Sequence, residues 1–307
     1  MNKITELKDR LRNVIEGSDE TLNMILVALA ANGHVLIEDV PGVGKTTLAK
    51  GLARLLHGTF HRIQFTPDLL PTDILGGMIY SPKTGDFSFR PGAVFCNILL
   101  ADEINRASPR TQAALLEAMN ERQVTIEGVT HPLPDLFMVI ATQNPIEHHG
   151  TYPLPEAELD RFAMQLKIGY PEAAQEVNLV LKHRQKHPLD DLLPVAETAE
   201  IVEIQHQVRQ VRVDQAIVEY MTSLVRRTRE EPRLQLGGSP RASLILYRSA
   251  QALALLRQRQ YVIPDDVKDL FVPILAHRVV LDTKARYSGV IAGEVVASVL
   301  GQVPVPA

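Results

Sequence analysis

Residues 34–56 read HVLIEDVPGVGKTTLAKGLARLL, and this segment carries most of the information about the class of fold. It joins a short apolar run (HVLIE) to a glycine-containing loop and then to a helical pattern (TTLAKGLARLL). A strand, a loop and a helix in this order form the setting in which a phosphate-binding P-loop occurs. Gly42 and Gly44 allow backbone N–H groups to point at phosphate oxygens, and the helix N-terminus adds partial positive charge. The segment therefore predicts an α/β fold with a nucleotide-binding loop.

The residues after the glycines have the chemistry that a bound nucleotide requires. Lys45 can reach the β- and γ-phosphates, and the Thr46 hydroxyl can ligate Mg²⁺. The general pattern GxxxxGK[ST] places glycine at position 39, where this chain has Asp39. A chance glycine-rich turn is the alternative, and the position of GKT between a strand and a helix argues against it. Nucleotide contacts are predicted for Pro41, Gly42, Val43, Gly44, Lys45, Thr46 and Thr47.

A second apolar strand ends in two acidic residues. The run Asn97–Ala101 (NILLA) is followed by Asp102 and Glu103. Beside a P-loop, Asp102 would hold Mg²⁺ through water, and Glu103 would polarise the attacking water as a general base. Taken alone the pair is a weak signal, because acidic residues commonly close strands. The P-loop upstream makes it a strong one.

A third apolar strand ends in a polar side chain. The run Leu136–Ala141 leads into Thr142, Gln143 and Asn144. Asn144 would face the γ-phosphate and could bond both a phosphate oxygen and the lytic water. On local sequence alone this interpretation is no better than the alternative, since Asn-Pro is a common start of a turn.

Strand patterns alternate with helix patterns up to Tyr170, which predicts a central five-stranded parallel sheet flanked by helices. Two turn-rich insertions, 74–93 and 123–134, are predicted to be hairpins. Beyond Tyr170 only amphipathic helices are expected, which predicts a C-terminal all-α domain. Pro188 to Pro194 is taken as the linker, so the predicted domains are 1–188 and 189–307. The predicted strands are Val35–Glu38, Arg62–Phe65, Asn97–Ala101, Leu136–Ala141 and Met164–Ile168, and the predicted C-terminal helices are 172–186, 198–211, 214–228, 241–257 and 264–280.

Composition narrows the function classes. The chain has 307 residues, a net charge of −4, no Trp and 5% aromatic residues, which disfavours a nucleic-acid-binding surface. The single Cys96 excludes an internal disulfide and a Cys-rich metal site. His57 with His61, and His148 with His149, raise the question of a metal site, but core or surface histidines are the favoured interpretation. No signal peptide or membrane span is recognisable, so a cytoplasmic protein is expected.

Four stretches together resemble one family. LIEDVPGVGKTTLAK, LLADEINRASPRTQAALLEAMNERQVT, ATQNPIE and GTYPLPEAELDRF are similar to stretches of the MoxR family of AAA+ ATPases. GGSPRAS and the AHRVVLD segment look like the C-terminal part of the same family. The resemblance covers nearly the whole chain. It implies a P-loop AAA+ core followed by a C-terminal α-helical lid.

The resemblance also implies roles for residues that spacing alone could not assign. By resemblance, Lys45 and Thr46 match Walker A, Asp102 and Glu103 match Walker B, and Asn144 matches sensor 1. Arg161 matches the arginine finger that reaches a neighbouring subunit's nucleotide, and Arg241 matches the sensor 2 arginine of the lid. Val14, Ile15 and Gly17 lie where the family lines its adenine pocket, although Ser18 stands where Gln is common. The insertions 74–93 and 123–134 match a helix-2 insert and a pre-sensor-1 hairpin, which in such ATPases face the pore of a ring, usually a hexamer.

By this resemblance the expected function is a mechanochemical ATPase that uses ATP/ADP and Mg²⁺. It would remodel, mature or activate client protein complexes, with von Willebrand A domain proteins as candidate partners. Magnesium chelatase subunits are similar in arrangement, so metal insertion is a related expectation. The alternatives are a DNA-stimulated motor, which the acidic composition disfavours, and a nucleotide-dependent binding switch with little turnover.

Overall fold

The computed structural model describes residues 3–12, 14, 19–40, 42–83, 85–144, 150–170, 173, 176–177 and 189–306. Several predictions fall on residues outside these ranges. They are the contacts of Pro41, Ile15 and Gly17, the pair His148 and His149, and almost all of the predicted helix 172–186. The start of the predicted linker, Pro188, also lies outside the described residues.

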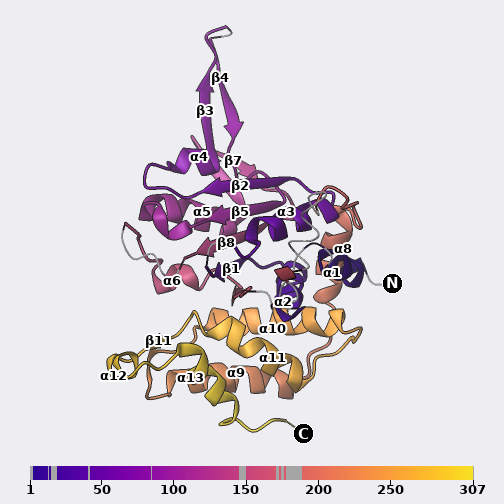
Figure 1. The fold of residues 1–307 in the computed structure, drawn as a ribbon, viewed down its shortest axis with the longest axis vertical. Helices are drawn as coiled ribbons and strands as arrows, with labels where there is room; N and C mark the ends of the chain where they lie inside the picture. The colour runs from indigo at the N-terminus through magenta and orange to yellow at the C-terminus, as the bar shows by residue number, and fades with distance from the viewer. Residues whose placement is uncertain are drawn as a thin grey trace.

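A five-stranded parallel sheet forms the centre of the N-terminal part, in the order β2-β5-β8-β1-β9 (Figure 1). The predicted parallel sheet and all five of its strands are confirmed, with small shifts at the strand ends. The strands are β1 (Val35–Glu38), β2 (Phe60–Gln64), β5 (Ile98–Asp102), β8 (Met138–Gln143) and β9 (Met164–Leu166).

Alternate side chains of the central strand β5 enter two different apolar cores, as the two-residue period of a strand requires. Ile98 and Leu100 belong to the core that includes helices on one face of the sheet. Leu99 and Ala101 belong to the core on the other face. This explains why the strand is a continuous apolar run rather than an alternating one. The first core contains residues of α1 (Lys3–Arg12), α2 (Asp19–Ala30) and α3 (Lys45–Leu55), and the second contains residues of α4 (Pro71–Leu75) and α5 (Pro109–Glu121).

Both predicted hairpins are present. Strands β3 (Gly76–Tyr80) and β4 (Phe87–Pro91) form a ribbon that projects from the body of the molecule (Figure 1), and β6 (Gln123–Ile126) pairs with β7 (Val129–Pro132). Gly76 is required at the base of the projecting ribbon, because it has a φ of 89° and a Cβ there would lie 2.3 Å from the carbonyl oxygen of Arg90.

The C-terminal part is mainly helical, as predicted. Figure 1 shows most of its helices below the sheet, with α10 (Pro240–Leu256) beside α2, whereas α8 (Thr198–Val208) lies level with the sheet. The prediction of no strand in this part is wrong for two short segments, β10 (Leu234–Leu236) and β11 (Val280–Leu281), which pair antiparallel. Segments of two or three residues are too short to show an alternating pattern. The helices are α8 (Thr198–Val208), α9 (Gln215–Arg229), α10 (Pro240–Leu256), α11 (Pro264–Leu275), α12 (Thr283–Tyr287) and α13 (Ala292–Leu300), with the short α6 (Glu156–Leu159) and a 3-10 turn (Ile104–Arg106) in the N-terminal part.

In the part of the chain that the structure describes, none of the helices has the length and apolar character needed to cross a membrane.

His34, just before β1, makes stability depend on pH. Its Nδ1 accepts a hydrogen bond of 3.0 Å from the Val139 N–H, its Nε2 lies 3.2 Å from the Met119 carbonyl oxygen, and burial lowers its pKa to about 4. A histidine in an unfolded chain has a pKa of about 6.5. Below that pH the unfolded chain takes up a proton that the folded chain excludes, so stability is full above it and is lost as pH falls toward 4.

We therefore expect His34 to contribute a loss of roughly 3 kcal/mol in the free energy of unfolding between pH 7 and pH 4. Urea unfolding at pH 7, 5.5 and 4 measures this loss. The His34→Gln variant, which cannot titrate, should show a shallower dependence than the unmodified chain. Equal slopes for the two proteins would refute this assignment.

Candidate nucleotide-binding site

A cavity of about 380 Å³ lies at the carboxyl edge of the sheet, between the P-loop and the ends of β2, β5 and β8. Most of the predicted site residues line it. Residues not predicted from the sequence also line it, and they come from β2 and from the end of β8. The lining residues are Gly42, Gly44, Lys45, Thr46, Thr47, Arg62, Gln64, Asp102, Glu103, Thr142 and Asn144.

The P-loop backbone has the shape that anion binding requires. Gly42 and Gly44 have φ values of 90° and 87°, a region that favours glycine, and a Cβ at either position would meet no atom within 4 Å. Backbone conformation, and not lack of space, therefore selects glycine here. Gly44 is the N-cap of α3 and offers no side-chain acceptor, so the first N–H groups of α3 are available to phosphate oxygens.

Lys45 is the first residue of α3 and follows the loop directly. Its Nζ donates a hydrogen bond of 2.8 Å to the Asp39 carbonyl oxygen. Burial lowers the pKa of Lys45, and the negative charges of Asp39, Asp102 and Glu103 oppose that shift. The site thus gathers one ammonium group and two carboxylates around a cavity, the arrangement that suits phosphate together with a divalent cation. Val43, in contrast, packs into the apolar core and does not line the cavity.

Asp39, the departure from the general P-loop pattern, has a structural partner. One carboxylate oxygen accepts hydrogen bonds of 2.7 Å from the N–H groups of Ile168 and Gly169, and the other accepts one of 2.8 Å from Val40. The side chain therefore ties the start of the P-loop to the segment that follows β9. Asp39 therefore has a structural role here, because backbone N–H groups donate hydrogen bonds to both of its carboxylate oxygens.

Thr142 organises the acidic pair and was missed from the sequence. Its Oγ1 donates a hydrogen bond of 2.6 Å to Asp102 Oδ1 and accepts one of 2.8 Å from the Glu103 N–H. The other oxygen of Asp102 forms an ion pair of 2.7 Å with Arg62. Asp102 is thereby fixed at the cavity with its carboxylate oriented by two donors, a typical support for a residue that binds a metal through water.

Glu103 is held in an uncommon backbone conformation, with φ 55° and ψ 52°. Its Oε2 accepts hydrogen bonds of 2.7 Å from Gln64 Nε2 and 2.9 Å from Arg106 Nη1. Residues other than glycine that adopt such a backbone cost about 1–3 kcal/mol and cluster at functional sites. In this conformation two donors engage the carboxylate that was predicted to act as the general base.

The remaining predicted residues lie elsewhere. Arg161 comes three residues before β9, at the amino edge of the sheet, where Ala163 N donates a hydrogen bond of 2.7 Å to the His34 carbonyl oxygen. Arg241 donates a hydrogen bond of 2.6 Å to Asn120, near the end of α5. Val14 is buried in the apolar core. None of the three residues lines the cavity.

Within the described ranges, no group of three or more His, Cys, Asp or Glu side chains is placed to hold a metal ion. His57 pairs with Glu197 at 2.9 Å, and His61 Nδ1 lies 2.9 Å from the Ala93 carbonyl oxygen. Cys96 is buried, which raises the pKa of its thiol to about 12 and keeps it protonated.

Thr142→Val is expected to weaken both the fold and the site. Valine has nearly the same shape but leaves Asp102 Oδ1 and the Glu103 N–H without their partner, at a cost of about 1–3 kcal/mol. Thermal unfolding should show a lower Tm, and titration calorimetry should show weaker binding of MgATP. The matched control is Thr142→Ser, which keeps the hydroxyl and should behave like the unmodified chain. A Val variant equal to the Ser variant in both measurements would contradict the role given to the hydroxyl.

Comparisons with known proteins identify the two parts of the chain. Residues 34–164 match the sequence model of the ATPase family associated with various cellular activities (AAA), and residues 226–299 match that of the AAA lid domain. The chain is 48% identical to the uncharacterised protein YeaC of Bacillus subtilis, over 97% of this chain and 93% of YeaC. It is 42% identical to chaperone MoxR1 of Mycobacterium tuberculosis, over 96% of this chain and 80% of MoxR1.

A solved structure is also similar along the whole chain. The crystal structure of a candidate ATPase from Cytophaga hutchinsonii is 37% identical and has a TM-score of 0.93, covering 100% of this chain and 96% of that one. Protein MoxR of Methylorubrum extorquens is 31% identical over 89% of this chain and 86% of its own length. The chain belongs to the MoxR family of AAA+ ATPases.

Proposed function

We propose that this chain binds MgATP at the carboxyl edge of its sheet and hydrolyses it where two copies meet in a ring. The observation that carries this proposal is that the predicted catalytic residues lie in two separate groups. The P-loop, the acidic pair and Asn144 surround the cavity, whereas Arg161 and Arg241 lie away from it. A neighbouring copy would have to supply the arginines.

Strand geometry supports the assignment of Arg161 to the nucleotide of another chain. β1 and β9 are parallel neighbours, with Val35 opposite Met164. The P-loop follows the carboxyl end of β1, and Arg161 precedes the amino end of β9. The four residues of β1 alone separate these ends by roughly 13 Å. Arg241 lies on the same side of the sheet as Arg161. Its partner Asn120 is two residues from Arg122. The Arg122 guanidinium donates to the carbonyl oxygen of Asn32, just before the amino end of β1.

Within the cavity, each group has a task that its position supports. Lys45 and the N-terminus of α3 would bind the β- and γ-phosphates, and Thr46 and Asp102 would hold Mg²⁺, directly and through water. Glu103 would take a proton from the attacking water, and Asn144 would orient that water. A bound Mg²⁺ would neutralise charge on the phosphates. We assign residues 1–188 to this nucleotide-binding core and residues 189–307 to the lid.

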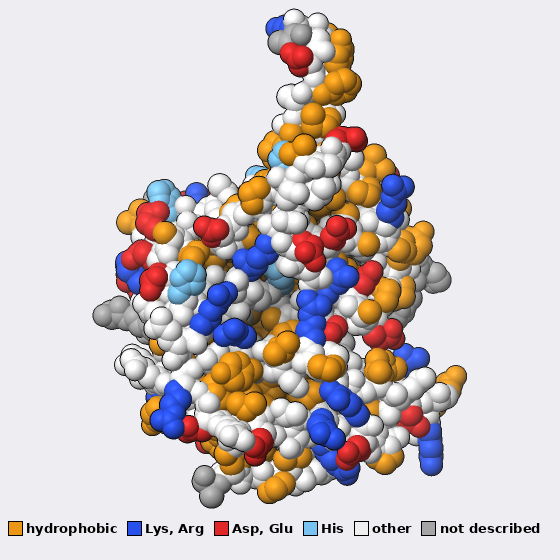
Figure 2. Space-filling model, turned by 180° about the vertical axis from the view of Figure 1, so that it is seen from behind, with side chains coloured by type: hydrophobic (Ala, Val, Ile, Leu, Met, Phe, Trp, Pro, Cys, Tyr) orange, Lys and Arg blue, Asp and Glu red, His pale blue; other side chains and the backbone are white. Residues whose placement is uncertain are grey.

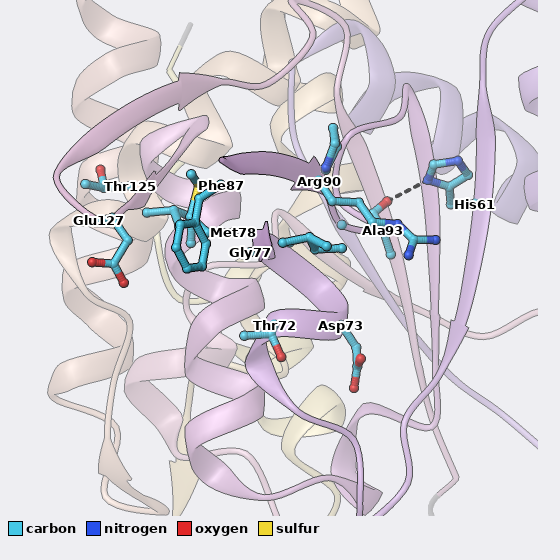
Figure 3. A pocket seen from close by; sticks show the side chains of 15 residues that line it. His61, Thr72, Asp73, Gly77, Met78, Phe87, Arg90, Ala93, Thr125 and Glu127 are labelled. Carbon is cyan, nitrogen blue, oxygen red and sulfur yellow. Dashed lines mark hydrogen bonds between the residues drawn. The ribbon is translucent and has the colours of Figure 1, made fainter. Parts of the chain in front are cut away.

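The two hairpins suggest where a client protein would be engaged. A cavity of about 1390 Å³ lies between β3–β4 and β6–β7, and Figure 3 shows Met78 and Phe87 beside it together with the charged Glu127 and Arg90. Phe87 is 65% exposed, and Tyr80 and Met78 of the same ribbon are 51% and 41% exposed, so the ribbon presents a contiguous apolar surface. In a ring, these hairpins would present apolar contacts to an unfolded or partly folded segment of a client. A von Willebrand A domain partner and a role in metal insertion are extensions of the same proposal.

ATP turnover measured against protein concentration tests the proposal. The rate should rise more steeply than linearly, because each site needs a neighbour, and Lys45→Ala should abolish it by removing the main cation at the phosphates. Double-stranded DNA should leave the rate unchanged, which separates this function from a DNA-stimulated motor. A rate that is strictly proportional to concentration would contradict hydrolysis at interfaces. MgATP binding without turnover at any concentration would favour a binding switch.

A further inference from the structure

A buried arginine of the lid is bound to the core segment that carries Arg161. Arg278 is 3% exposed, and its Nε donates a hydrogen bond of 2.9 Å to Asp160 Oδ1. Its two terminal nitrogens donate to the carbonyl oxygens of Asp160, Phe162 and Ala163. One guanidinium thus binds the backbone on both sides of Arg161.

The lid holds the same guanidinium from its own side. Arg278 Nη1 donates to the Ile274 carbonyl oxygen and lies 2.6 Å from His277 Nε2. Burial and the charge of Arg278 lower the pKa of His277 well below its ordinary value, and His277 Nε2 also lies 3.2 Å from the Phe162 carbonyl oxygen. The guanidinium is therefore held by residues of the lid as well as by the core segment.

A second lid contact reaches the same carboxylate. Ser239 Oγ donates a hydrogen bond of 3.0 Å to Asp160 Oδ2. Ser239 is also the N-cap of α10, and Arg241 stands two residues further on. Asp160, adjacent to Arg161, is in this way joined to the helix start that carries Arg241.

Charge explains why a carboxylate is needed at this point. Burial lowers the pKa of Arg278 to about 10, Asp160 opposes that shift, and the nearby positive charge of Arg241 adds to it. Arg278 and Arg241 therefore lie close enough to repel each other, and the carboxylate of Asp160 offsets this repulsion at Arg278. Figure 2 shows Lys and Arg side chains gathered around the hollow where the sheet body meets the lid.

We propose that Asp160, Ser239 and Arg278 form a clasp that presents Arg161 and Arg241 as one unit to the nucleotide of a neighbouring subunit. Arg278 is then a positioning residue: its donors are all directed inward, so it acts through Arg161. The inference rests on the proposed function, since it requires Arg161 to act on a neighbour. An arginine is needed because only its planar fork can bind one carboxylate and several carbonyl oxygens together, and lysine would keep the charge without this geometry.

Mixed rings test the clasp, because they separate the subunit that gives the arginine from the one that gives the site. Lys45→Ala chains have a working Arg161 but no working P-loop, and Arg161→Ala chains have the reverse. Mixing the two should restore ATP turnover. The test then places Arg278→Lys on one partner at a time. On the Lys45→Ala chain it should reduce the restored rate by at least about tenfold, because a misplacement of about 1 Å can cost about 10²-fold.

On the Arg161→Ala chain, the same Arg278→Lys change should leave the restored rate within about twofold of the original mixture, because that chain supplies only the site. This asymmetry distinguishes positioning from a general role in folding, which would lower the rate on either side. The matched control is Arg259→Lys, which weakens a lid arginine that pairs with the buried Asp266 and touches no residue of the clasp. On either chain it should leave the restored rate unchanged.

Asp160→Asn gives the same test from the core side, and it replaces Arg278→Lys if the Arg278→Lys chain does not fold. Thermal unfolding checks that each variant folds, and native mass spectrometry checks that the two chains co-assemble. Restored turnover that is insensitive to the clasp changes, or equally sensitive on both chains, overturns the clasp alone. A co-assembled mixture of the two parent variants that shows no restored turnover overturns the proposed interface function, and the clasp with it.

Discussion

Arg161→Ala is expected to slow ATP hydrolysis by about 10³–10⁵-fold while MgATP still binds to the P-loop of the same chain. Arginines that stabilise the transition state of phosphoryl transfer from a second subunit have effects of this size, because their charge is needed only as the bond breaks. Single-turnover phosphate release measures the rate, and calorimetric titration with MgATP measures binding.

Two observations argue against the alternative that Arg161 only stabilises the fold. Both carboxylate oxygens of Asp160 are already engaged, because they accept hydrogen bonds from Arg278 and Ser239. Burial raises the pKa of Glu158, and the positive charge of Arg161 opposes this rise, so the two side chains lie near each other. Glu158 Oε2 is nevertheless buried without a hydrogen-bond partner, so Arg161 does not donate to that oxygen. A purely structural Arg161 predicts a lower Tm and a turnover loss no larger than the unfolded fraction explains.

A suitable control for Arg161→Ala is Arg226→Ala. Arg226 is an exposed lid arginine, so its loss changes the net charge equally and should leave turnover unchanged. If the two variants hydrolyse ATP at similar rates, the assignment of Arg161 to a neighbour's site is wrong.

The sequence predicted the elements whose signal is local. The strand β5 is a continuous apolar run, and the P-loop lies between a strand and a helix, so both could be located from nearest neighbours alone. β10 and β11 could not, because two or three residues leave no measurable period. Their pairing depends on positions 234 and 281, which only the packing of the lid brings together.

Residues whose role depends on strand register were missed for a related reason. Ala101 lies opposite Ala141, which places Thr142 beside Asp102, and Gln64 lies opposite Asp102. Neither alignment is visible in the sequence, since sliding a strand by one residue moves its side chains to the other face. Arg278 was missed because its partners in the core lie 115 or more residues away, although the AHRVVLD segment around it already resembled the family.

Glu103→Gln is expected to bind MgATP normally and to lose at least about 10²-fold in turnover, the usual effect of removing a general base. The amide retains the size of the side chain and an oxygen that can accept from Arg106 or Gln64, which now hold the carboxylate at 2.9 and 2.7 Å. Lys45, Thr46 and Asp102 are untouched, so the phosphates and Mg²⁺ should still bind. Calorimetry and phosphate release on the same preparation separate the two effects.

Glu117→Gln, on the exposed face of α5, removes the same charge away from the cavity and should leave turnover unchanged. Near-normal turnover of Glu103→Gln would mean that another group activates the water. A loss of binding together with turnover would mean instead that Glu103 is a ligand of the metal. The expected pattern, with binding kept and chemistry lost, follows from where the carboxylate lies. It lines the cavity just after β5, and both of its donors, Gln64 and Arg106, bind Oε2.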